Sequence, residues 1–283
     1  MLKAVGLGDN VVDQYLHRNI MYPGGNAVNV AVYAKELDAA AAYVGVFGND
    51  RAGRHIHDVL TEIGIDLTRC RTENGENGYS AVDLVDGDRT YIGGNDGGVG
   101  KTHPLRLDAE DLEYLTAFDL IHTSCYSHIE PELEKLSKLR ALLSFDFSDR
   151  FTDAYADKLC PFIDIGLISC GAGTDEDVAN VAKKAHAAGC RMVLCSRGKR
   201  GATLSMDGRA YAQPAKKIKA VDTLGAGDAF FTAFILNYLG KTEGALRGDA
   251  EETIAQSLRI AADFATKICM RDGAFGYGIP LRK

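Results

Sequence analysis

Near the C-terminus stands the stretch Val221-Asp222-Thr223-Leu224-Gly225-Ala226-Gly227-Asp228-Ala229-Phe230-Phe231, in which small residues precede an acid and the start of an apolar helix. Gly225, Ala226 and Gly227 leave the backbone uncrowded, so we expect their amides to form an anion hole at the positive end of that helix. An acid beside a bound anion is unfavourable unless it has a chemical task. Asp228 could accept the proton of an attacking hydroxyl, as a catalytic base. The alternative is that Asp228 only caps the helix.

A second stretch, Pro23-Gly24-Gly25-Asn26-Ala27-Val28-Asn29-Val30-Ala31, again places glycines and then amides at a helix start. The two stretches together resemble the signatures of the ribokinase-like carbohydrate kinases, also called the phosphofructokinase-B family: residues 24–29 look like the N-terminal signature and residues 222–228 like the C-terminal one. The resemblance covers essentially the whole chain. It implies one ribokinase-like domain over residues 1–283 and an ATP-dependent kinase that phosphorylates a primary hydroxyl of a sugar or sugar adduct.

Composition narrows the class of protein independently of the motifs. The chain has 283 residues, 46% hydrophobic and 25% charged, which suits a large α/β domain with a substantial core. The formal charge of -7 disfavours nucleic acid as a partner, and the sequence has no apolar tract long enough to cross a membrane. Seven scattered cysteines without metal-site spacing, and an N-terminus that reaches Asp9 early, predict a soluble cytoplasmic protein with reduced thiols.

Apolar runs alternate with helical stripes along most of the chain. Strands are expected near residues 3–8, 40–47, 119–125, 142–147, 163–170 and 192–196. Between the last two, the Thr174/Asp177 pattern predicts a capping box for a helix over residues 174–188. Repeated βα units predict a doubly wound, mostly parallel sheet with helices on both faces, and ligands at the carboxyl ends of its strands.

One segment interrupts this alternation. Residues 78–85 and 90–92 are β-formers joined by a turn at Asp86-Gly87-Asp88-Arg89, which predicts a hairpin. A hairpin cannot easily join a parallel sheet, so we expect a small β lid from about residues 78–94 and part of 11–23. Such a lid would also allow a homodimer.

The resemblance assigns further roles to named residues. Asp13 matches the family acid that binds sugar hydroxyls, for which a carboxylate is suited because it accepts two hydrogen bonds. Residues 146–150 resemble the polar cluster near the transferred phosphate. The expected substrate-binding residues are Asp9, Asp13, Gly25, Asn26 and Asn29. The expected ATP-binding residues are Ser196, Gly198, Gly201 and Gly273.

The metal site is where the sequence departs from the family pattern. The family's Asn-x-x-Glu is replaced by Ser169 and Ala172, so the metal ligands stay unknown, with Asp175 or Glu176 as candidate substitutes. We therefore expect magnesium to enter mainly as MgATP. A monovalent cation is also compatible with the resemblance.

Several alternatives stay open on these residues. Lys101-Thr102 ends a near match to a phosphate-binding P-loop, but Asn95 stands where glycine is needed. Within the family, residues 8–13 and 273–278 look most like fructoselysine 6-kinases, whose cationic amine would suit acids such as Asp9, Asp83 and Asp96. Fructose, ribose and nucleoside kinases are the remaining enzymes, the last because Tyr79 and Tyr91 could stack a base. A non-catalytic nucleotide-binding regulator is disfavoured by Asp228.

Overall fold

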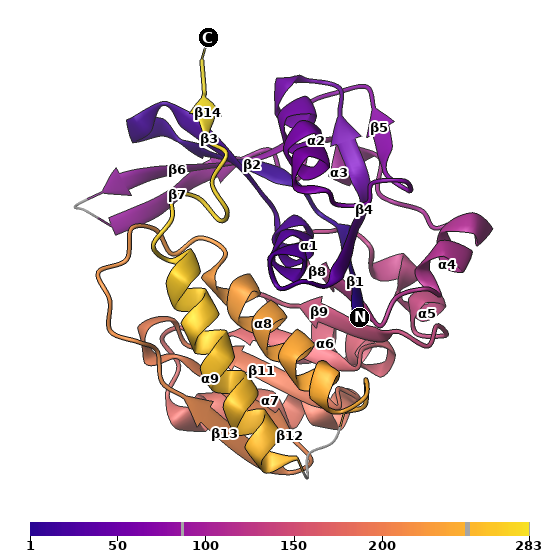
Figure 1. Ribbon diagram of the computed structural model, residues 1–283, viewed down its shortest axis with the longest axis vertical. Helices are drawn as coiled ribbons and strands as arrows, with labels where there is room; N and C mark the ends of the chain where they lie inside the picture. Colours follow the sequence, from indigo (N-terminus) through magenta and orange to yellow (C-terminus); the bar gives the residue numbers. More distant parts are fainter. Residues whose placement is uncertain (86–87, 247–249, 283) are drawn as a thin grey trace.

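The computed structural model describes residues 1–85, 88–246 and 250–282, and their strands fall into two separate sheets (Figure 1). The larger sheet has nine strands in the order β13-β12-β11-β10-β9-β8-β1-β4-β5. All neighbours from β5 to β11 are parallel, whereas β12 and β13 add an antiparallel edge. The strands are β1 (Lys3–Gly8), β4 (Ala40–Gly48), β5 (Arg71–Glu73), β8 (Leu120–Ser124), β9 (Leu142–Asp146), β10 (Ile165–Ser169), β11 (Met192–Ser196), β12 (Ala202–Met206) and β13 (Arg209–Gln213). The predicted mostly parallel sheet is confirmed.

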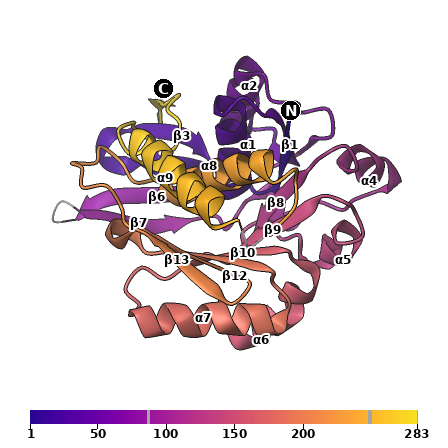
Figure 2. The same ribbon diagram turned by 60° about the horizontal axis from the view of Figure 1, so that its bottom comes forward.

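Helices cover both faces of this sheet, as predicted, and Figure 2 shows α8 and α9 on one side and α6 and α7 on the other. One hydrophobic cluster contains side chains of α1 (Asn26–Glu36), α2 (Arg51–Ile63), α8 (Ala226–Lys241) and α9 (Glu251–Ile268). The opposite cluster contains those of α4 (Ala109–Leu115), α5 (Leu133–Leu136), α6 (Asp153–Leu159) and α7 (Asp175–Ala188). The short elements are α3 (Val99–Thr102), η1 (Leu16–Arg18), η2 (Glu130–Glu132), η3 (Cys160–Phe162) and η4 (Gly198–Arg200).

Local sequence explains where α7 begins, and the position of α8 explains its apolar composition. The capping box of α7 is present, with the Thr174 hydroxyl accepting from the Asp177 amide at 3.2 Å and the Asp177 carboxylate accepting from the Thr174 amide at 2.8 Å. α8 is apolar on nearly all sides because it lies between the sheet and the neighbouring helices α1 and α9.

The smaller sheet stands at one end of the molecule, beyond the upper ends of α8 and α9 in Figure 1. Its order is β14-β3-β2-β6-β7, with β2 and β6 parallel and the other pairs antiparallel. The strands are β2 (Val11–Tyr15), β3 (Ile20–Gly24), β6 (Gly78–Val85), β7 (Asp88–Gly94) and β14 (Ile279–Pro280). The expected hairpin therefore stands apart from the parallel sheet together with part of residues 11–23, and its turn residues 86–87 lie outside the described residues. The contribution of β14 was not predicted.

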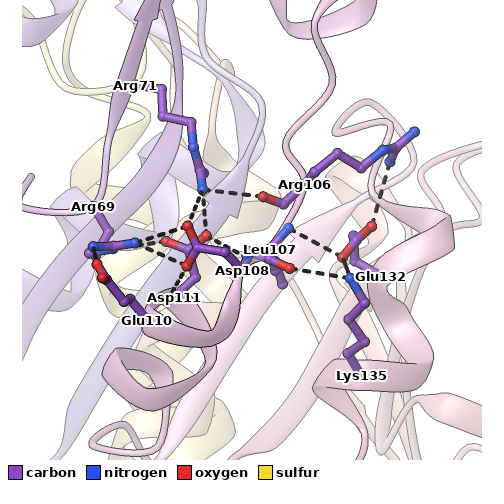
Figure 3. A network of polar contacts seen from close by, with 9 residues as sticks. All are labelled: Arg69, Arg71, Arg106, Leu107, Asp108, Glu110, Asp111, Glu132 and Lys135. Carbon is purple, nitrogen blue, oxygen red and sulfur yellow. Dashed lines mark hydrogen bonds and ion pairs between the residues drawn. The ribbon is translucent and has the colours of Figure 1, made fainter.

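A charged network joins the edge strand β5 to α4 and η2 (Figure 3). Asp111 in α4 is only 1% exposed, and its carboxylate accepts hydrogen bonds from Arg69, from Arg71 and from the Asp108 amide. The buried Glu132 bonds to the Leu107 amide at 3.2 Å and to Lys135 at 2.6 Å. These contacts hold the segment between β7 and β8 against β5 and η2.

Two general features concern the rest of the chain. Over the ranges that the structure describes, no helix combines the length and apolar character needed to span a membrane. All seven cysteines are free thiols, and Cys125, Cys160, Cys190 and Cys195 are buried.

Candidate functional site

The two glycine motifs meet at the carboxyl edge of the larger sheet, where α1 and α8 both begin. Gly25 caps α1 with φ +110° and Gly225 caps α8 with φ +70°, conformations that favour glycine. A Cβ on Gly225 would also lie only 2.4 Å from the Tyr33 hydroxyl of α1. The glycines therefore let the positive ends of two helices approach the same space.

That space is a cleft of about 1020 Å³ between the larger and the smaller sheet. Tyr79, Ser80 and Tyr91 line it from the smaller sheet, and Asp146 and Ser169 line it from the ends of β9 and β10. The predicted residues that line it are Asp9, Asp13, Gly25, Asn26, Asn29, Gly225, Ala226, Gly227 and Asp228. The structure thus brings together the five residues expected to bind the substrate, the three of the anion hole and Asp228, whereas Asp83, one of the acids expected near an amine, is not among the described residues that line the cleft.

Asp228 lies in the first turn of α8, and its half-buried carboxylate points at α1. One oxygen accepts from the Asn26 amide nitrogen at 2.7 Å and the other accepts from the Asn29 amide nitrogen at 2.7 Å. Gly225 is the N-cap residue, and α8 has no side-chain cap, so Asp228 does not serve as the cap of its helix. Burial and the neighbouring Asp146 carboxylate raise the pKa of Asp228 well above its ordinary value, against the opposing hydrogen bond from Asn29.

Asp146 forms the second carboxylate of the cleft. It accepts from the Ser148 amide at 2.7 Å and from Asn26 Nδ2 at 2.8 Å. Burial raises the pKa of Asp146 to about 6, although both of these hydrogen bonds act in the opposite direction. Both hydrogens of the Asn26 amide nitrogen are therefore used by carboxylates, one by Asp146 and one by Asp228.

His122 of β8 completes this arrangement and was missed from the sequence. Its Nε2 lies 2.6 Å from Asn26 Oδ1 and its Nδ1 lies 2.9 Å from the Ser144 hydroxyl. The side chain is fully buried, and burial lowers the pKa of His122 to about 3, so the ring is neutral. The available signal was a histidine that follows the apolar residues Leu120 and Ile121 in a strand that ends in Thr123 and Ser124.

Asp9 and Asp13 occupy different surroundings. The Asp9 carboxylate accepts from the amides of Asn26 and Ala27, at 2.6 and 3.3 Å, and from the hydroxyls of Ser124 and Ser127, both at 2.9 Å. It thereby fixes the start of α1 to the loop after β8. Asp13, on β2 of the smaller sheet, is buried with only 6% of its surface exposed.

The amides of the expected anion hole lie at the start of α8. The Ala226 amide donates to the Thr223 carbonyl at 3.3 Å. The amides of Gly227 and Asp228 belong to the first turn, which the hydrogen-bond ladder of a helix does not use. These two amides are the best placed to meet an anion, together with the dipole of a sixteen-residue helix.

The four expected ATP residues lie on two other loops and are not among the described residues that line the cleft. Ser196 ends β11, Gly198 begins η4, and Gly201 follows that turn. Gly273 follows α9, and its amide donates to Asp222 at 3.1 Å.

The basic side chains beside these loops bind backbone and a carboxylate. Arg200 donates to the carbonyls of Gly171 and Gly173, at 2.7 and 2.5 Å. Arg197 pairs with Asp175 at 2.6 Å. The arginines therefore hold the loop after β10 that contains Ala172, where the resemblance led us to look for metal ligands.

This loop also bears on the metal. Ser169 lines the cleft, but Asp175, one of the expected substitutes, is engaged by Arg197. Within residues 1–85, 88–246 and 250–282, no three His, Cys, Asp or Glu side chains are grouped so that they could hold a metal ion. That magnesium enters mainly as MgATP therefore stays a prediction.

Comparison with known proteins gives a consistent result. A family model described as pfkB family carbohydrate kinase matches residues 3–276. The chain is 39% identical over 282 residues to fructosamine kinase FrlD of Bacillus subtilis (strain 168), covering 99% of this chain and 95% of that protein. It is 30% identical over 233 residues to fructoselysine 6-kinase of Escherichia coli (strain K12), covering 82% and 87%.

A solved ribokinase structure has a similar fold. The structure of Arabidopsis thaliana ribokinase complexed with ribose and ATP matches with a TM-score of 0.79 at 22% identity, covering 98% of this chain and 95% of that one. The larger sheet, its helices and the smaller sheet are thus the ribokinase-like fold. The chain belongs to the pfkB family of ATP-dependent carbohydrate kinases.

Proposed function

We propose that this kinase phosphorylates the primary hydroxyl of a ketose carried on an amine, with fructoselysine as acceptor and fructoselysine 6-phosphate as product. The observation that carries the proposal is Asp228, held by Asn26 and Asn29 at the start of α8 in a cleft covered by the smaller sheet. The relatives support the acceptor class, because the two reported above are a fructosamine kinase and a fructoselysine kinase.

The chemistry assigns one task to each part of the cleft. The acceptor hydroxyl oxygen attacks the γ-phosphorus of ATP, the bond from that phosphorus to the β,γ-bridging oxygen breaks, and ADP leaves. The hydroxyl proton passes to Asp228 as the new bond forms, because a carboxylate cannot remove an alcohol proton beforehand. The amides of Gly227 and Asp228, with that of Gly225, hold the charge of the transferring group, whereas the expected Ala226 amide already donates to the Thr223 carbonyl.

The remaining expected residues are assigned to the sugar or to ATP by their position in the fold. We assign Asp13, Gly25 and Asn29 to the sugar, and Ser196, Gly198, Gly201 and Gly273 to ATP. Magnesium, supplied as MgATP, would neutralise phosphate charge. A monovalent cation, a homodimer through the smaller sheet and a cytoplasmic location stay predictions, and the last fits a reaction that consumes ATP.

The amine needs a different explanation from the one expected. Asp9 is bound by α1 and two serines, Asp83 lies 3.3 Å from His17, and Asp96 pairs with Lys101, so none of the three is reserved for a substrate amine. The cleft as a whole is acidic, because six aspartates and one arginine are its charged lining residues among those described. We propose that this combined field, rather than one ion pair, favours a cationic acceptor.

Product analysis tests the proposal. Purified protein with MgATP and fructoselysine should release ADP, and ¹³C and ³¹P NMR should place the new phosphate on C6. The Asp228→Asn variant serves as the control for a contaminating kinase. Phosphate on another carbon, or ADP release that is equal in the variant, would refute the assignment.

A further inference from the structure

Asn26 has a hydrogen-bond pattern that a sugar ligand does not need. Its two amide hydrogens face Asp146 Oδ2 at 2.8 Å and Asp228 Oδ1 at 2.7 Å, and its Oδ1 faces His122 Nε2 at 2.6 Å. A sugar hydroxyl could reach this side chain only through the second lone pair of Oδ1. The amide is thus committed to two carboxylates on one side and a histidine on the other.

The orientation of each group in this chain follows from its neighbours. Two carboxylates that accept hydrogen bonds require the Asn26 nitrogen to face them, so Oδ1 must face His122. The neutral ring then carries its proton on Nε2 and accepts at Nδ1 from the Ser144 hydroxyl, whose 2.9 Å contact is shorter than its 3.2 Å contact to the Ile121 carbonyl. One tautomer and one amide orientation satisfy all five side chains: Asn26, His122, Ser144 and the two carboxylates.

We propose that Asn26 and His122 are positioning residues of the phosphoryl transfer: Asn26 holds Asp228 and Asp146 at a fixed separation, and His122 fixes which end of the Asn26 amide faces them. The inference rests on the proposed role of Asp228. This role replaces the expected contact of Asn26 with the sugar. Asp146 is then the second carboxylate that Asn26 holds, close enough for its negative charge to act on Asp228.

The charged groups around Asp228 and Asp146 decide in which direction the protonation of Asp228 changes when the Asn26 contact is lost. Asp228 is faced by Asp146 of β9, by Asp9 after β1, by Asp13 of β2, and by Asn29 and Tyr33 of α1. Asp146 is also close to Asp149. Among these groups, only the amides of Asn26 and Asn29 donate to Asp228, so loss of the Asn26 contact should favour its protonated form.

Substitution of His122 tests the proposal without touching the cleft. His122→Leu frees the Asn26 amide to turn, so kcat should fall by about 10- to 100-fold while KM for the sugar changes by less than about three-fold. In the plot of kcat/KM against pH, the acidic limb should move to higher pH by about one unit, as expected when a carboxylate loses a hydrogen bond. His122→Gln, which can place an N–H near the position of Nε2, should recover kcat to within about three-fold of wild type.

A second histidine offers a matched control. His186 of α7 also makes two contacts, to the Cys190 carbonyl at 2.7 Å and the Ser205 hydroxyl at 2.9 Å, but lies outside the cleft. His186→Leu should leave the acidic limb in place. NMR titration of ¹³C-labelled aspartates in the free protein compares the pKa of Asp228 in wild type, His122→Leu and His186→Leu without any substrate. The Asp228 signal is identified by its loss in Asp228→Asn.

The outcomes separate this inference from the proposed function. If Asp228→Asn turns over normally, the proposed function fails. If Asp228→Asn is slow but His122→Leu keeps the wild-type kcat and acidic limb, or raises only KM, the positioning role is wrong. If His122→Leu does not fold, Ser144→Ala decides, since it removes the far hydroxyl and should shift the limb in the same direction; an unchanged limb would overturn the proposal.

Discussion

Asp228 is the residue on which the chemistry depends. Replacing it by asparagine keeps the size of the side chain and removes its ability to take a proton. We expect Asp228→Asn to lower kcat by about 10²- to 10⁴-fold, or ~3–5 kcal/mol of barrier, while ATP binding measured by calorimetry stays close to wild type. Asp58→Asn, on the exposed surface of α2, is the control. A variant that keeps nearly normal kcat would show that another group accepts the proton.

The same substitution should not weaken the fold at neutral pH. Asn29 Oδ1 is buried without a hydrogen-bond partner, and a turn of the Asn29 amide would let it accept from the amide that the substitution introduces. Because the folded-state pKa of Asp228 is raised above the ordinary value of 3.8, its ionised form costs stability at high pH and its protonated form does not. The Tm of Asp228→Asn should therefore equal or exceed that of wild type at pH 8, and the difference should vanish as the pH falls toward 4.

Thermal unfolding between pH 4 and 8 measures this directly. A variant that is less stable than wild type at pH 8, with the difference unchanged at pH 4, would mean that Asp228 stabilises the fold.

The sequence predicted one part of this site well and another part poorly. Asp228, Gly225 and Asn29 belong to short motifs whose local spacing determines their geometry. His122 and the serine ligands of Asp9 could not be found this way, because they approach α1 from the end of β8, about a hundred residues further along the chain. Asn26 was found, but its contacts with Asp146 and Asp228 depend on which strands are neighbours.

Among the elements, the hairpin of β6 and β7 belongs to a sheet that lines the cleft and has only a small hydrophobic cluster of its own among the described residues. Only Tyr15, Tyr22 and Val82 form its own hydrophobic cluster among the described residues, with Ile20 packed against them. We expect the amides of β6 and β7 to exchange faster without the acceptor than with it, because the acceptor adds contacts on the cleft side. Hydrogen exchange with β1 and β4 as internal controls tests this. Equally slow exchange in both states would identify the smaller sheet as a rigid part of the molecule.

Asp111 tests how the edge of the larger sheet is held. Burial alone would raise the pKa of Asp111, but the Asp108 amide, Arg71 and Arg69 outweigh it and lower the pKa. Asp111→Asn should lower the free energy of unfolding by ~2–4 kcal/mol at pH 7, since it leaves two arginines without their buried partner. Because a lowered pKa stabilises the fold above the unfolded-state value and is lost as the pH falls, the difference should shrink below about pH 4.

Denaturant unfolding of Asp111→Asn and Glu110→Gln provides the comparison. Glu110 also pairs with Arg69 but is 82% exposed, so its substitution should cost less than about 1 kcal/mol. Equal effects of the two substitutions would contradict a special role for the buried carboxylate.

Elements with strong local signals were predictable, and those defined by distant partners were not. The α7 capping box and the hairpin of β6 and β7 follow from a few adjacent residues. β14 is two residues long and exists because Ile279 and Pro280 pair with Met21 and Ile20. The β12–β13 edge lacks a buried apolar face over residues 209–213, so its sequence resembles a loop.

At the scale of the whole molecule, the order of strands and helices followed from the alternation of βα units, and the position of the cleft followed from that order. The acidity of the cleft did not, because it depends on which aspartates face the same space. Asp83 and Asp96 looked suitable for an amine in the sequence, yet their neighbours His17 and Lys101 are visible only in the fold.

The acceptor preference tests the central claim most directly. We would measure kcat/KM at saturating MgATP, by ADP release, for fructoselysine, a second fructosamine, fructose, ribose and adenosine. The acidic cleft and the close relatives predict that both amine-linked ketoses exceed the other acceptors by ten-fold or more, about 1.4 kcal/mol. A higher kcat/KM for ribose or adenosine would contradict the claim.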